Sequence, residues 1–251
     1  MKTIIIAGPC SAESNEQIDI AISEAKKRKV DFLRVNLWKP RTKPGFEGLK
    51  EEGIKLMINA ARNGVNPATE VLTPGQADFV MKRVLSAAPQ TKLLLWLGAR
   101  NQNHFIQQEI AKLASRDKRV SLLVKNQPWT NEEHWEGIIE HVVKGGISKT
   151  VLINCHRGFS PIGKNPYGFR NSPDFEMAVR VRNKTKIPVV FDPSHAGGSV
   201  ENVYRLARQA KIYALDGIMV EVHHDPKNAL TDSKQQVTWS QFDDIIKEMG
   251  L

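Results

Sequence analysis

The sequence has few cysteines and no long hydrophobic run. Its 251 residues include only two cysteines, Cys10 and Cys155, which lie far apart in the chain. Two distant cysteines without an export signal argue against a disulfide-stabilised secreted protein, so we expect both thiols to be free. No segment approaches the roughly 18 apolar residues that a membrane span needs, and the apolar segment at the N-terminus is too short for a signal peptide. We therefore expect a cytoplasmic protein that binds no membrane.

The sequence also lacks a concentrated basic segment, although its net charge is +9. A charge of this size suits nucleic acid, an anionic membrane or small anionic molecules as partners. The basic residues are scattered along the chain, without an arginine-rich arm, a zinc-finger spacing or an aromatic-basic repeat. Small anions are therefore the preferred ligands, and we expect no nucleic-acid partner.

Short apolar segments alternate with longer amphipathic segments along the chain. Eight apolar segments are predicted strands, at residues 3–8, 32–37, 65–71, 92–98, 120–125, 150–155, 187–192 and 217–222. Helical spacing lies between them, for example at 15–28, 51–63, 76–88, 131–144 and 199–211, and at the end in 241–250. Continuous apolar strands favour a parallel sheet covered on both faces. This pattern predicts a single (β/α)₈ TIM barrel over residues 1–251, with an open doubly wound sheet as the alternative.

Polar residues follow the predicted strands at the end where a barrel places its active site. Several of them are cations, namely Lys39, Arg41, Arg100, Lys125 and Arg157. So many positive charges at one mouth would repel each other unless anions fill it. We therefore expect a substrate that carries phosphate or carboxylate groups.

Another set of residues at the strand ends has the chemistry of metal ligands. Cys10, His195 and Glu221 follow or end the first, seventh and eighth predicted strands, and Asp232 lies in the loop after the last one. A thiolate, an imidazole and two carboxylates suit a borderline divalent cation. The long spacing fits no short motif, so Cys10 alone could equally be a buried apolar residue or a nucleophile. Closure of a barrel would bring these strands side by side.

Seven short segments along the chain resemble the motifs of a known enzyme family, in the same order. They read AGPCS (7–11), WKPRTKPGFEGLKEEG (38–53), TEV (69–71), LGARNQNHF (97–105), CHRGF (155–159), FDPSHAGG (191–198) and EVHHDPKNALTDSKQQ (221–236). Together they resemble the DAHP synthases, which make 3-deoxy-D-arabino-heptulosonate 7-phosphate at the entry to the shikimate pathway of aromatic amino acid and chorismate biosynthesis. The resemblance is strongest to the short subgroup related to the 3-deoxy-octulosonate phosphate synthases. It implies a metal-dependent condensation of phosphoenolpyruvate with erythrose 4-phosphate and water in a (β/α)₈ barrel.

The resemblance also implies roles for single residues. The metal ligands would be Cys10, His195, Glu221 and Asp232, with a divalent ion of the Mn, Fe, Co or Zn type. Phosphoenolpyruvate would be held by Arg100, Lys125 and Arg157, with Arg34 and Lys39 approaching from the second strand. Erythrose 4-phosphate would lie against Lys39, Pro40, Arg41 and Thr42. Lys39 is the implied general acid, whereas Glu70 is either the group that activates water or a structural partner of an arginine. His156 receives no role.

Control of the family's activity by aromatic end products depends on elements added to the barrel. We expect no appended regulatory domain here, and hence insensitivity to aromatic amino acids, chorismate and prephenate. Any regulator would be a separate domain or partner, such as a helical chorismate mutase module. We also expect the chain to form a homodimer or homotetramer. A phosphate-binding barrel without catalytic activity is the alternative, but it would have no use for the set of Cys, His, Glu and Asp ligands.

Overall fold

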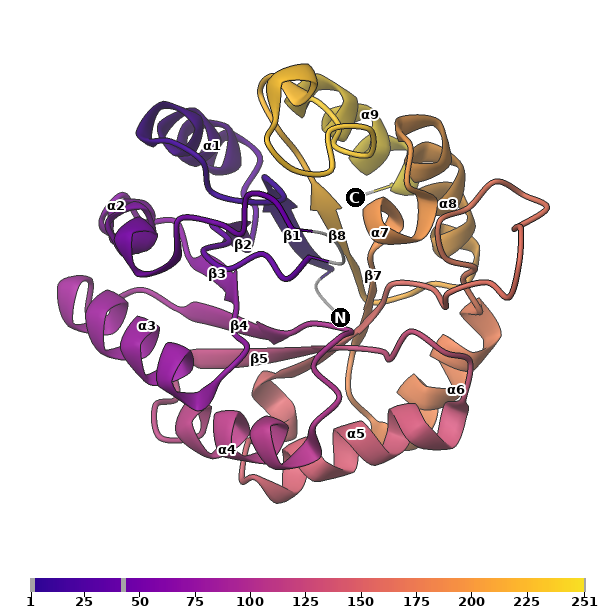
Figure 1. The fold of residues 1–251 in the computed structure, drawn as a ribbon, viewed down its shortest axis with the longest axis horizontal. Helices are drawn as coiled ribbons and strands as arrows, with labels where there is room; N and C mark the ends of the chain where they lie inside the picture. Colours follow the sequence, from indigo (N-terminus) through magenta and orange to yellow (C-terminus); the bar gives the residue numbers. More distant parts are fainter. Residues whose placement is uncertain (1–2, 42–43, 251) are drawn as a thin grey trace.

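The eight apolar segments form parallel strands that close into a barrel in sequence order, as Figure 1 shows. The computed structural model describes residues 3–41 and 44–250. The last strand pairs with the first in parallel, so the prediction of a (β/α)₈ TIM barrel is confirmed and the open sheet is excluded. The strands are β1 (Ile4–Gly8), β2 (Phe32–Arg34), β3 (Pro67–Glu70), β4 (Leu93–Leu97), β5 (Val120–Lys125), β6 (Leu152–His156), β7 (Val189–Phe191) and β8 (Gly217–Glu221).

Helices cover the outside of the barrel, mostly one after each strand (Figure 1). They are α1 (Asn15–Lys27), α2 (Ile54–Arg62), α3 (Pro74–Ala87), α4 (His104–Ala114), α5 (Glu132–Lys144), α6 (Phe175–Thr185), α8 (Val200–Ile212) and α9 (Trp239–Met249). The connection after β7 holds an additional short helix, α7 (Pro193–Gly197), before α8 begins. Three short 3₁₀ helices, η1 (Lys50–Gly53), η2 (Lys149–Val151) and η3 (Pro226–Asn228), lie in connections.

Local sequence signals set where several helices begin. Ser14 caps α1, because its side chain accepts a hydrogen bond from the Gln17 amide at 3.1 Å. Thr238 and Gln241 form a reciprocal capping box at the start of α9. Because such caps satisfy amides that have no partner within the helix, they favour a defined first residue in the helices that carry them.

Side chains alternate between the two faces of each strand, and in most strands both faces are apolar. In β4, Leu94 and Trp96 belong to a buried cluster that takes residues from every strand and fills the barrel interior. Leu93, Leu95 and Leu97 belong instead to the larger cluster between the barrel and its helices. The strands therefore read as continuous apolar segments, as expected for a parallel sheet buried on both sides.

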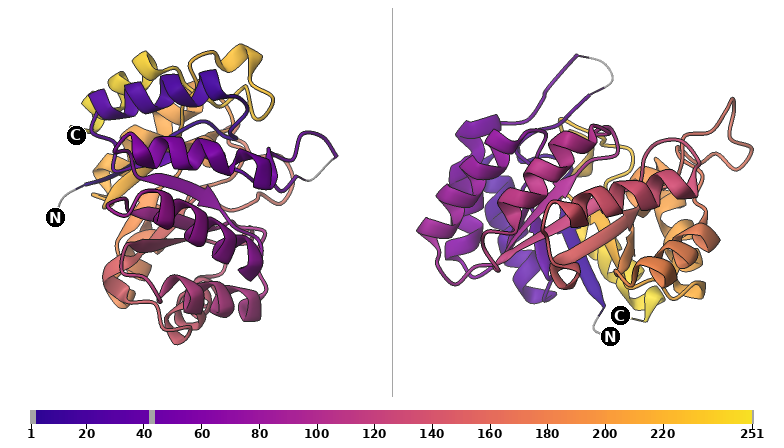
Figure 2. Two further views of the ribbon diagram at one scale, coloured as in Figure 1. Left: turned by 90° about the vertical axis from the view of Figure 1, so that its left-hand side faces the viewer. Right: turned by 90° about the horizontal axis from the view of Figure 1, so that it is seen from below.

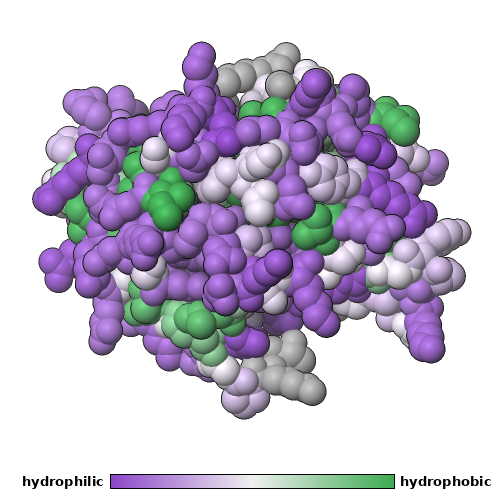
Figure 3. All heavy atoms as spheres, turned by 90° about the horizontal axis from the view of Figure 1, so that it is seen from above, coloured by the Kyte–Doolittle hydropathy of each residue, from purple (hydrophilic) through white to green (hydrophobic). Residues whose placement is uncertain are grey.

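The long connections β2–α2 and β6–α6 project from the same end of the barrel, beyond the carboxyl ends of the strands (Figure 2). The face shown in Figure 3 is mainly hydrophilic, and its hydrophobic residues form small separate spots. Within residues 3–41 and 44–250, no helix is long and apolar enough to cross a membrane.

Candidate active site

The barrel opens at the carboxyl ends of its strands into a cavity of about 420 Å³. Its wall comes from the ends of β2 to β7 and the connections that follow them. Active sites of parallel β/α barrels lie at this end. Seven of the residues predicted from the sequence line the cavity: Lys39, Pro40, Glu70, Arg100, Lys125, Arg157 and His195.

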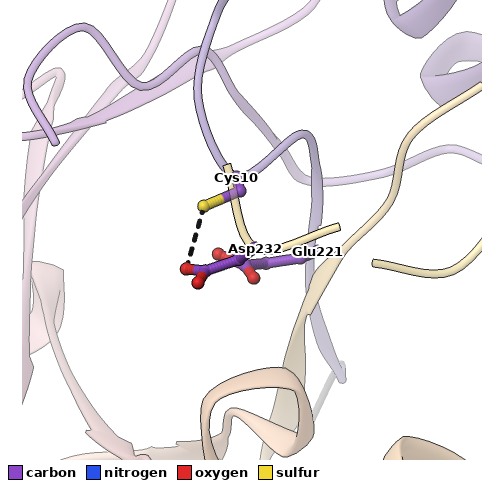
Figure 4. A group of neighbouring side chains, drawn as sticks. All are labelled: Cys10, Glu221 and Asp232. Atoms are coloured by element: carbon purple, nitrogen blue, oxygen red, sulfur yellow. Dashed lines mark hydrogen bonds between the residues drawn. The ribbon is translucent and has the colours of Figure 1, made fainter. Parts of the chain in front are cut away.

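Three of the four predicted metal ligands form a cluster next to this cavity. Cys10 follows β1, Glu221 ends β8, and Asp232 lies in the connection between β8 and α9. One potential ligand atom from each lies within 4.8 Å of the other two, and the side chains point toward one another in Figure 4. The Cys10 Sγ lies 3.4 Å from Asp232 Oδ2. Barrel closure, which pairs β8 with β1, thus joins residues more than two hundred positions apart.

His195 reaches the edge of this cluster from α7. Its Nε2 lies 3.6 Å from Glu221 Oε1, while its Nδ1 lies 2.8 Å from Asp192 Oδ2. Burial lowers the pKa of His195 to about 4, so the ring is neutral near pH 7. With Nδ1 donating to Asp192, Nε2 carries the lone pair and faces Glu221. This is the arrangement that a metal-binding histidine needs.

A lysine ammonium lies against the donor cluster. Lys39 Nζ is 2.8 Å from Cys10 Sγ and 2.8 Å from Asp232 Oδ2. Burial alone would lower the pKa of Lys39, but the acidic groups around it, Cys10, Glu221 and Asp232, outweigh burial and raise it. Burial, and secondarily Glu221, raise the pKa of the Cys10 thiol, which Lys39 partly counteracts. The cluster is therefore built to hold positive charge.

The donor set fits a divalent metal ion. Sulfur, imidazole nitrogen and carboxylate oxygen are the ligands of borderline cations such as Zn²⁺ and Fe²⁺. A metal ion also favours the thiolate form of a bound cysteine, which compensates for the burial of Cys10. The structure thus supports a Cys, Glu and Asp site with His195 beside it.

Cations occupy the other side of the cavity. Lys125 and Arg157 are buried there, and Arg100 lies at its edge with Nη1 donating to the Pro40 carbonyl at 3.2 Å. Lys125 Nζ lies 2.6 Å from Asp192 Oδ2, and Arg157 Nη1 donates to Asn171 Oδ1 at 3.1 Å. Burial lowers the pKa of Arg157 to about 10, which still leaves it charged at neutral pH. These groups can bind the charged oxygens of a small anion.

Arg34 lies beneath the donor cluster rather than in the lining of the cavity. It is 1% exposed, and its Nη2 is 2.9 Å from Glu221 Oε1. The guanidinium also lies over the Trp96 ring, 5.1 Å from its centre. Its Nη1 is buried and has no hydrogen-bond partner among the described residues, which leaves two N–H groups for a ligand or a water. Arg34 thus holds Glu221 in place from below.

Glu70 extends into the cavity from the end of β3. A Cβ atom on Gly98 would lie 1.9 Å from Glu70 Oε1, so only glycine at position 98 leaves room for this carboxylate. Burial raises the pKa of Glu70, although Lys125 and Lys39 oppose the shift. A carboxyl with a raised pKa beside a polar cavity can exchange protons. The structure therefore leaves Glu70 available for activating water.

The remaining predicted substrate residues belong to the β2–α2 connection. Arg41 is exposed and lines a second cavity of about 300 Å³, which shares much of its wall with the first. Its Nη1 donates to the Phe46 carbonyl at 3.3 Å. Thr42 lies outside the described residues, so its predicted contact stays a prediction.

Sequence reasoning gave no role to Asp192, which the structure places at the centre of the site. The carboxylate is fully buried, and its Oδ2 contacts both Lys125 and His195. Burial alone would raise the pKa of Asp192, but His195 and Lys125 hold it well below its usual range. The available signal was an acidic residue directly after a buried strand, within FDPSH. Asp192 thus joins the metal side of the cavity to its cationic side.

His156 has a structural environment, in agreement with its lack of a predicted role. Its ring is fully buried against Trp135, with ring centres 5.4 Å apart. Nε2 accepts a hydrogen bond from the Asp174 amide, and burial lowers the pKa of the ring to about 3. A neutral, buried ring that faces the helices can take no part in chemistry inside the barrel.

Asp192→Asn should weaken both sides of the site at once. The isosteric change removes the charge that pairs with Lys125 and the acceptor that fixes the Nδ1 proton of His195. Removing a group that orients a metal ligand costs roughly 10- to 100-fold in metal affinity. We expect such a loss in metal titrations and a raised KM for the anionic substrate in initial rates. Asp78→Asn on the surface of α3 is the matched control, and unchanged constants in Asp192→Asn would contradict this role.

Comparison with known proteins places the chain in a family. The family model described as "DAHP synthetase I family" matches residues 1–250. Phospho-2-dehydro-3-deoxyheptonate aldolase of Thermotoga maritima is 33% identical over 247 residues, which cover 98% of this chain and 68% of the relative. The 2-dehydro-3-deoxyphosphooctonate aldolase of Stenotrophomonas maltophilia is 28% identical over 271 aligned positions, which cover 98% of this chain and 89% of that enzyme.

Solved structures agree with this placement. The crystal structure of the Thermotoga maritima DAHP synthase superposes with a TM-score of 0.85 at 31% identity, covering 99% of this chain and 68% of that one. A truncated form of the Thermotoga enzyme gives a TM-score of 0.82 at 29% identity, with 99% and 86% covered. The closed barrel and the donor cluster beside a cationic cavity agree with this placement. Because the family model matches nearly the whole chain, the chain belongs to the DAHP synthetase I family of enzymes.

Proposed function

We propose that this enzyme condenses phosphoenolpyruvate with erythrose 4-phosphate and water to give 3-deoxy-D-arabino-heptulosonate 7-phosphate and phosphate. The observation that carries the proposal is a cavity with buried cations in its wall and a Cys, Glu and Asp donor cluster next to it. Two anionic substrates and a metal ion would together neutralise this charge pattern. Membership of the family supports the same reaction.

Phosphoenolpyruvate would lie at the inner end of the cavity. Lys125 and Arg157 are 6% and 9% exposed, so their charges act in a space with little water. Such groups bind carboxylate and phosphate oxygens more strongly than they would in solvent, and they hold C3 of the enol in one orientation. Arg100 would close the outer side of this subsite.

Erythrose 4-phosphate would enter from the β2–α2 side, with its aldehyde near Lys39. A divalent cation held by Cys10, His195, Glu221 and Asp232 would act as a Lewis acid on the aldehyde oxygen. Lys39 Nζ, which already contacts two residues of that cluster, is placed to give a proton to the same oxygen as C3 attacks the carbonyl carbon. The new carbon–carbon bond would thus form between the two halves of the cavity.

Water would then add to C2 of the former phosphoenolpyruvate. Glu70 extends into the same cavity from β3 and would take a proton from this water. The C–O bond to phosphate breaks, and Lys125 and Arg157 stabilise the charge on the departing phosphate. Every side chain named in these steps belongs to the cavity wall or to the donor cluster.

Phosphoenolpyruvate consumption tests the proposal directly. Purified protein supplied with a divalent metal should consume phosphoenolpyruvate only when erythrose 4-phosphate is present, and should release one phosphate for each molecule consumed. A barrel that merely binds phosphate would bind both compounds without turnover. Absence of turnover with each of Mn²⁺, Fe²⁺, Co²⁺ and Zn²⁺ would therefore refute the proposed activity.

The enzyme should prefer erythrose 4-phosphate to arabinose 5-phosphate by roughly 100-fold in kcat/KM, because a misplacement of about 1 Å costs that much. Pro40 fixes its own φ, and its carbonyl accepts from Arg100, so the wall next to Arg41 is rigid. A longer aldehyde would push its phosphate away from Arg41. Initial rates with both aldehydes measure the ratio, and Pro40→Ala should lower it. Equal efficiencies would instead point to the chemistry of the octulosonate relatives.

A further inference from the structure

Three cavities meet at the mouth of the barrel, and Arg170 lines all of them. The catalytic cavity has a volume of about 420 Å³, the cavity next to Arg41 about 300 Å³, and a third cavity beside α7 and α8 about 520 Å³. Arg170 belongs to the β6–α6 connection, which faces the β2–α2 connection across the mouth. A ligand that extends from the catalytic cavity into the cavity next to Arg41 would therefore pass the guanidinium of Arg170.

The cavity of about 300 Å³ has a large excess of positive charge. Its wall contains one carboxylate, that of Asp232, and five lysine and arginine side chains: Lys39, Arg41, Arg100, Arg157 and Arg170. Asp232 is already 2.8 Å from Lys39 Nζ. A single carboxylate cannot balance this charge, so the cavity favours a dianion such as a phosphate monoester.

The backbone at Arg170 is held firmly by α7. The Arg170 amide donates to the Gly197 carbonyl at 3.3 Å, and the next amide, that of Asn171, donates to the Ala196 carbonyl at 2.9 Å. Gly198 has a φ of +75°, and a Cβ atom on it would lie 2.7 Å from the Cβ of Arg170. This close approach places the aliphatic part of the Arg170 side chain in the wall of the third cavity, beside α7.

The side chain of Arg170 has one anionic partner, Asp232, at the long distance of 3.4 Å, and it shares this carboxylate with Lys39. Its Nη1 donates to the neutral Gln235 Oε1 at 2.8 Å, whereas Asp232 Oδ1 is 3.4 Å away. The side chain is 39% exposed, so a ligand can reach it. Phosphate oxygens form stronger, charge-assisted hydrogen bonds with a guanidinium than an amide oxygen does.

We propose that Arg170 binds the phosphate group of the aldehyde substrate, opposite Arg41, and so helps to select a phosphorylated aldehyde. This proposal rests on the proposed function and adds a residue to it. Lys39 and Arg170 approach different oxygens of the same Asp232 carboxylate. A short sugar phosphate can therefore place its aldehyde at Lys39 and its phosphate at Arg170.

The test compares erythrose 4-phosphate with erythrose, which lacks the phosphate. Arg170→Ala should raise KM for erythrose 4-phosphate at least tenfold, because a charge-assisted contact is lost. It should leave KM for phosphoenolpyruvate, metal affinity and kcat/KM for erythrose within twofold of the unchanged protein. Arg170→Lys should recover part of the loss. Lys234→Ala is the matched control, since Lys234 is exposed and lines only the third of these cavities.

Two outcomes would overturn the proposal. If Arg170→Ala left KM for erythrose 4-phosphate unchanged, the phosphate would bind elsewhere. If it lowered activity equally with erythrose, or weakened metal binding, Arg170 would only support Gln235 and Asp232. Calorimetry with erythritol 4-phosphate, which has no aldehyde, gives an independent readout: Arg170→Ala should bind it at least tenfold more weakly. Failure of the proposed function would look different, because the unchanged protein would then not consume phosphoenolpyruvate.

Discussion

Replacing Cys10 with alanine is expected to lower activity by at least about 1000-fold while the protein remains folded. Cys10 supplies the sulfur of the donor cluster, and its Sγ lies 3.4 Å from Asp232 Oδ2. Without it, the remaining oxygen and nitrogen ligands would hold the divalent cation weakly, and the Lewis acid that polarises the aldehyde would be lost. Metal content by elemental analysis, turnover of phosphoenolpyruvate and circular dichroism measure the three parts of this prediction.

Cys155→Ser is the matched control for Cys10→Ala. Cys155 is also a buried free thiol, but it lies within the core of the barrel and outside the donor cluster. We expect this variant to keep its metal. A strong chelator should inactivate the unchanged protein, and added metal should restore it. Full activity after exhaustive removal of metal would contradict the role of Cys10.

Lys39→Met should lower kcat by roughly 100- to 10,000-fold, the usual contribution of a positioned general acid. Lys39 Nζ touches both the donor cluster and the catalytic cavity, so its loss removes the proton donor at the aldehyde. Metal binding should persist, because the lysine is a cation that lies against the ligands rather than a ligand itself. Single-turnover rates and metal titration separate these two effects.

Lys82→Met is the control for Lys39→Met, since Lys82 is an exposed lysine paired with Asp78 on α3. It should have no effect on either measurement. If Lys39→Met kept its kcat and changed only KM, Lys39 would bind substrate without transferring a proton. If it lost its metal, the lysine would instead organise the donor cluster.

The fold could be predicted from sequence because most of the strands are apolar on both faces. Strand ends were less predictable, as residues 32–37 show. The predicted strand covers all six positions, but β2 ends at Arg34. Beyond it, the Asn36 side chain accepts from the Glu70 amide at 2.9 Å, and the Thr69 hydroxyl accepts from the Leu37 amide at 3.1 Å. Side-chain hydrogen bonds thus replace the backbone hydrogen bonds between β2 and β3 at the point where the site begins. A pattern of apolar residues cannot predict where this change occurs.

The start of α2 shows a similar limit. Helical spacing predicts a helix over 51–63, whereas α2 begins at Ile54 after the 3₁₀ helix η1. No side chain caps either helix, so the sequence carries no signal at the boundary. At α1, which Ser14 caps, prediction and structure agree on the first helical residue. The capped helices α3 and α9 nevertheless begin at Pro74 and Trp239, each two residues before the predicted start.

Some features of the candidate site could be predicted from the sequence, whereas others could not. Cations at the strand ends could be predicted, since barrel topology alone brings them to one mouth. The contacts of Asp192 and Arg170 could not, because they are made with residues 67 and 62 positions away, Lys125 and Asp232 respectively. Only the closed barrel shows that one carboxylate oxygen serves Lys125 and His195 together.

The most direct test of the proposed chemistry is mass spectrometry of the product formed by metal-free and metal-restored protein. Both samples receive phosphoenolpyruvate and erythrose 4-phosphate under reducing conditions. We expect no product without metal, and 3-deoxy-D-arabino-heptulosonate 7-phosphate with an equal amount of phosphate after one equivalent of a suitable divalent ion is added. Product formed at the same rate by the metal-free protein, or none with any of Mn²⁺, Fe²⁺, Co²⁺ and Zn²⁺, would contradict a metal-dependent condensation in this cavity.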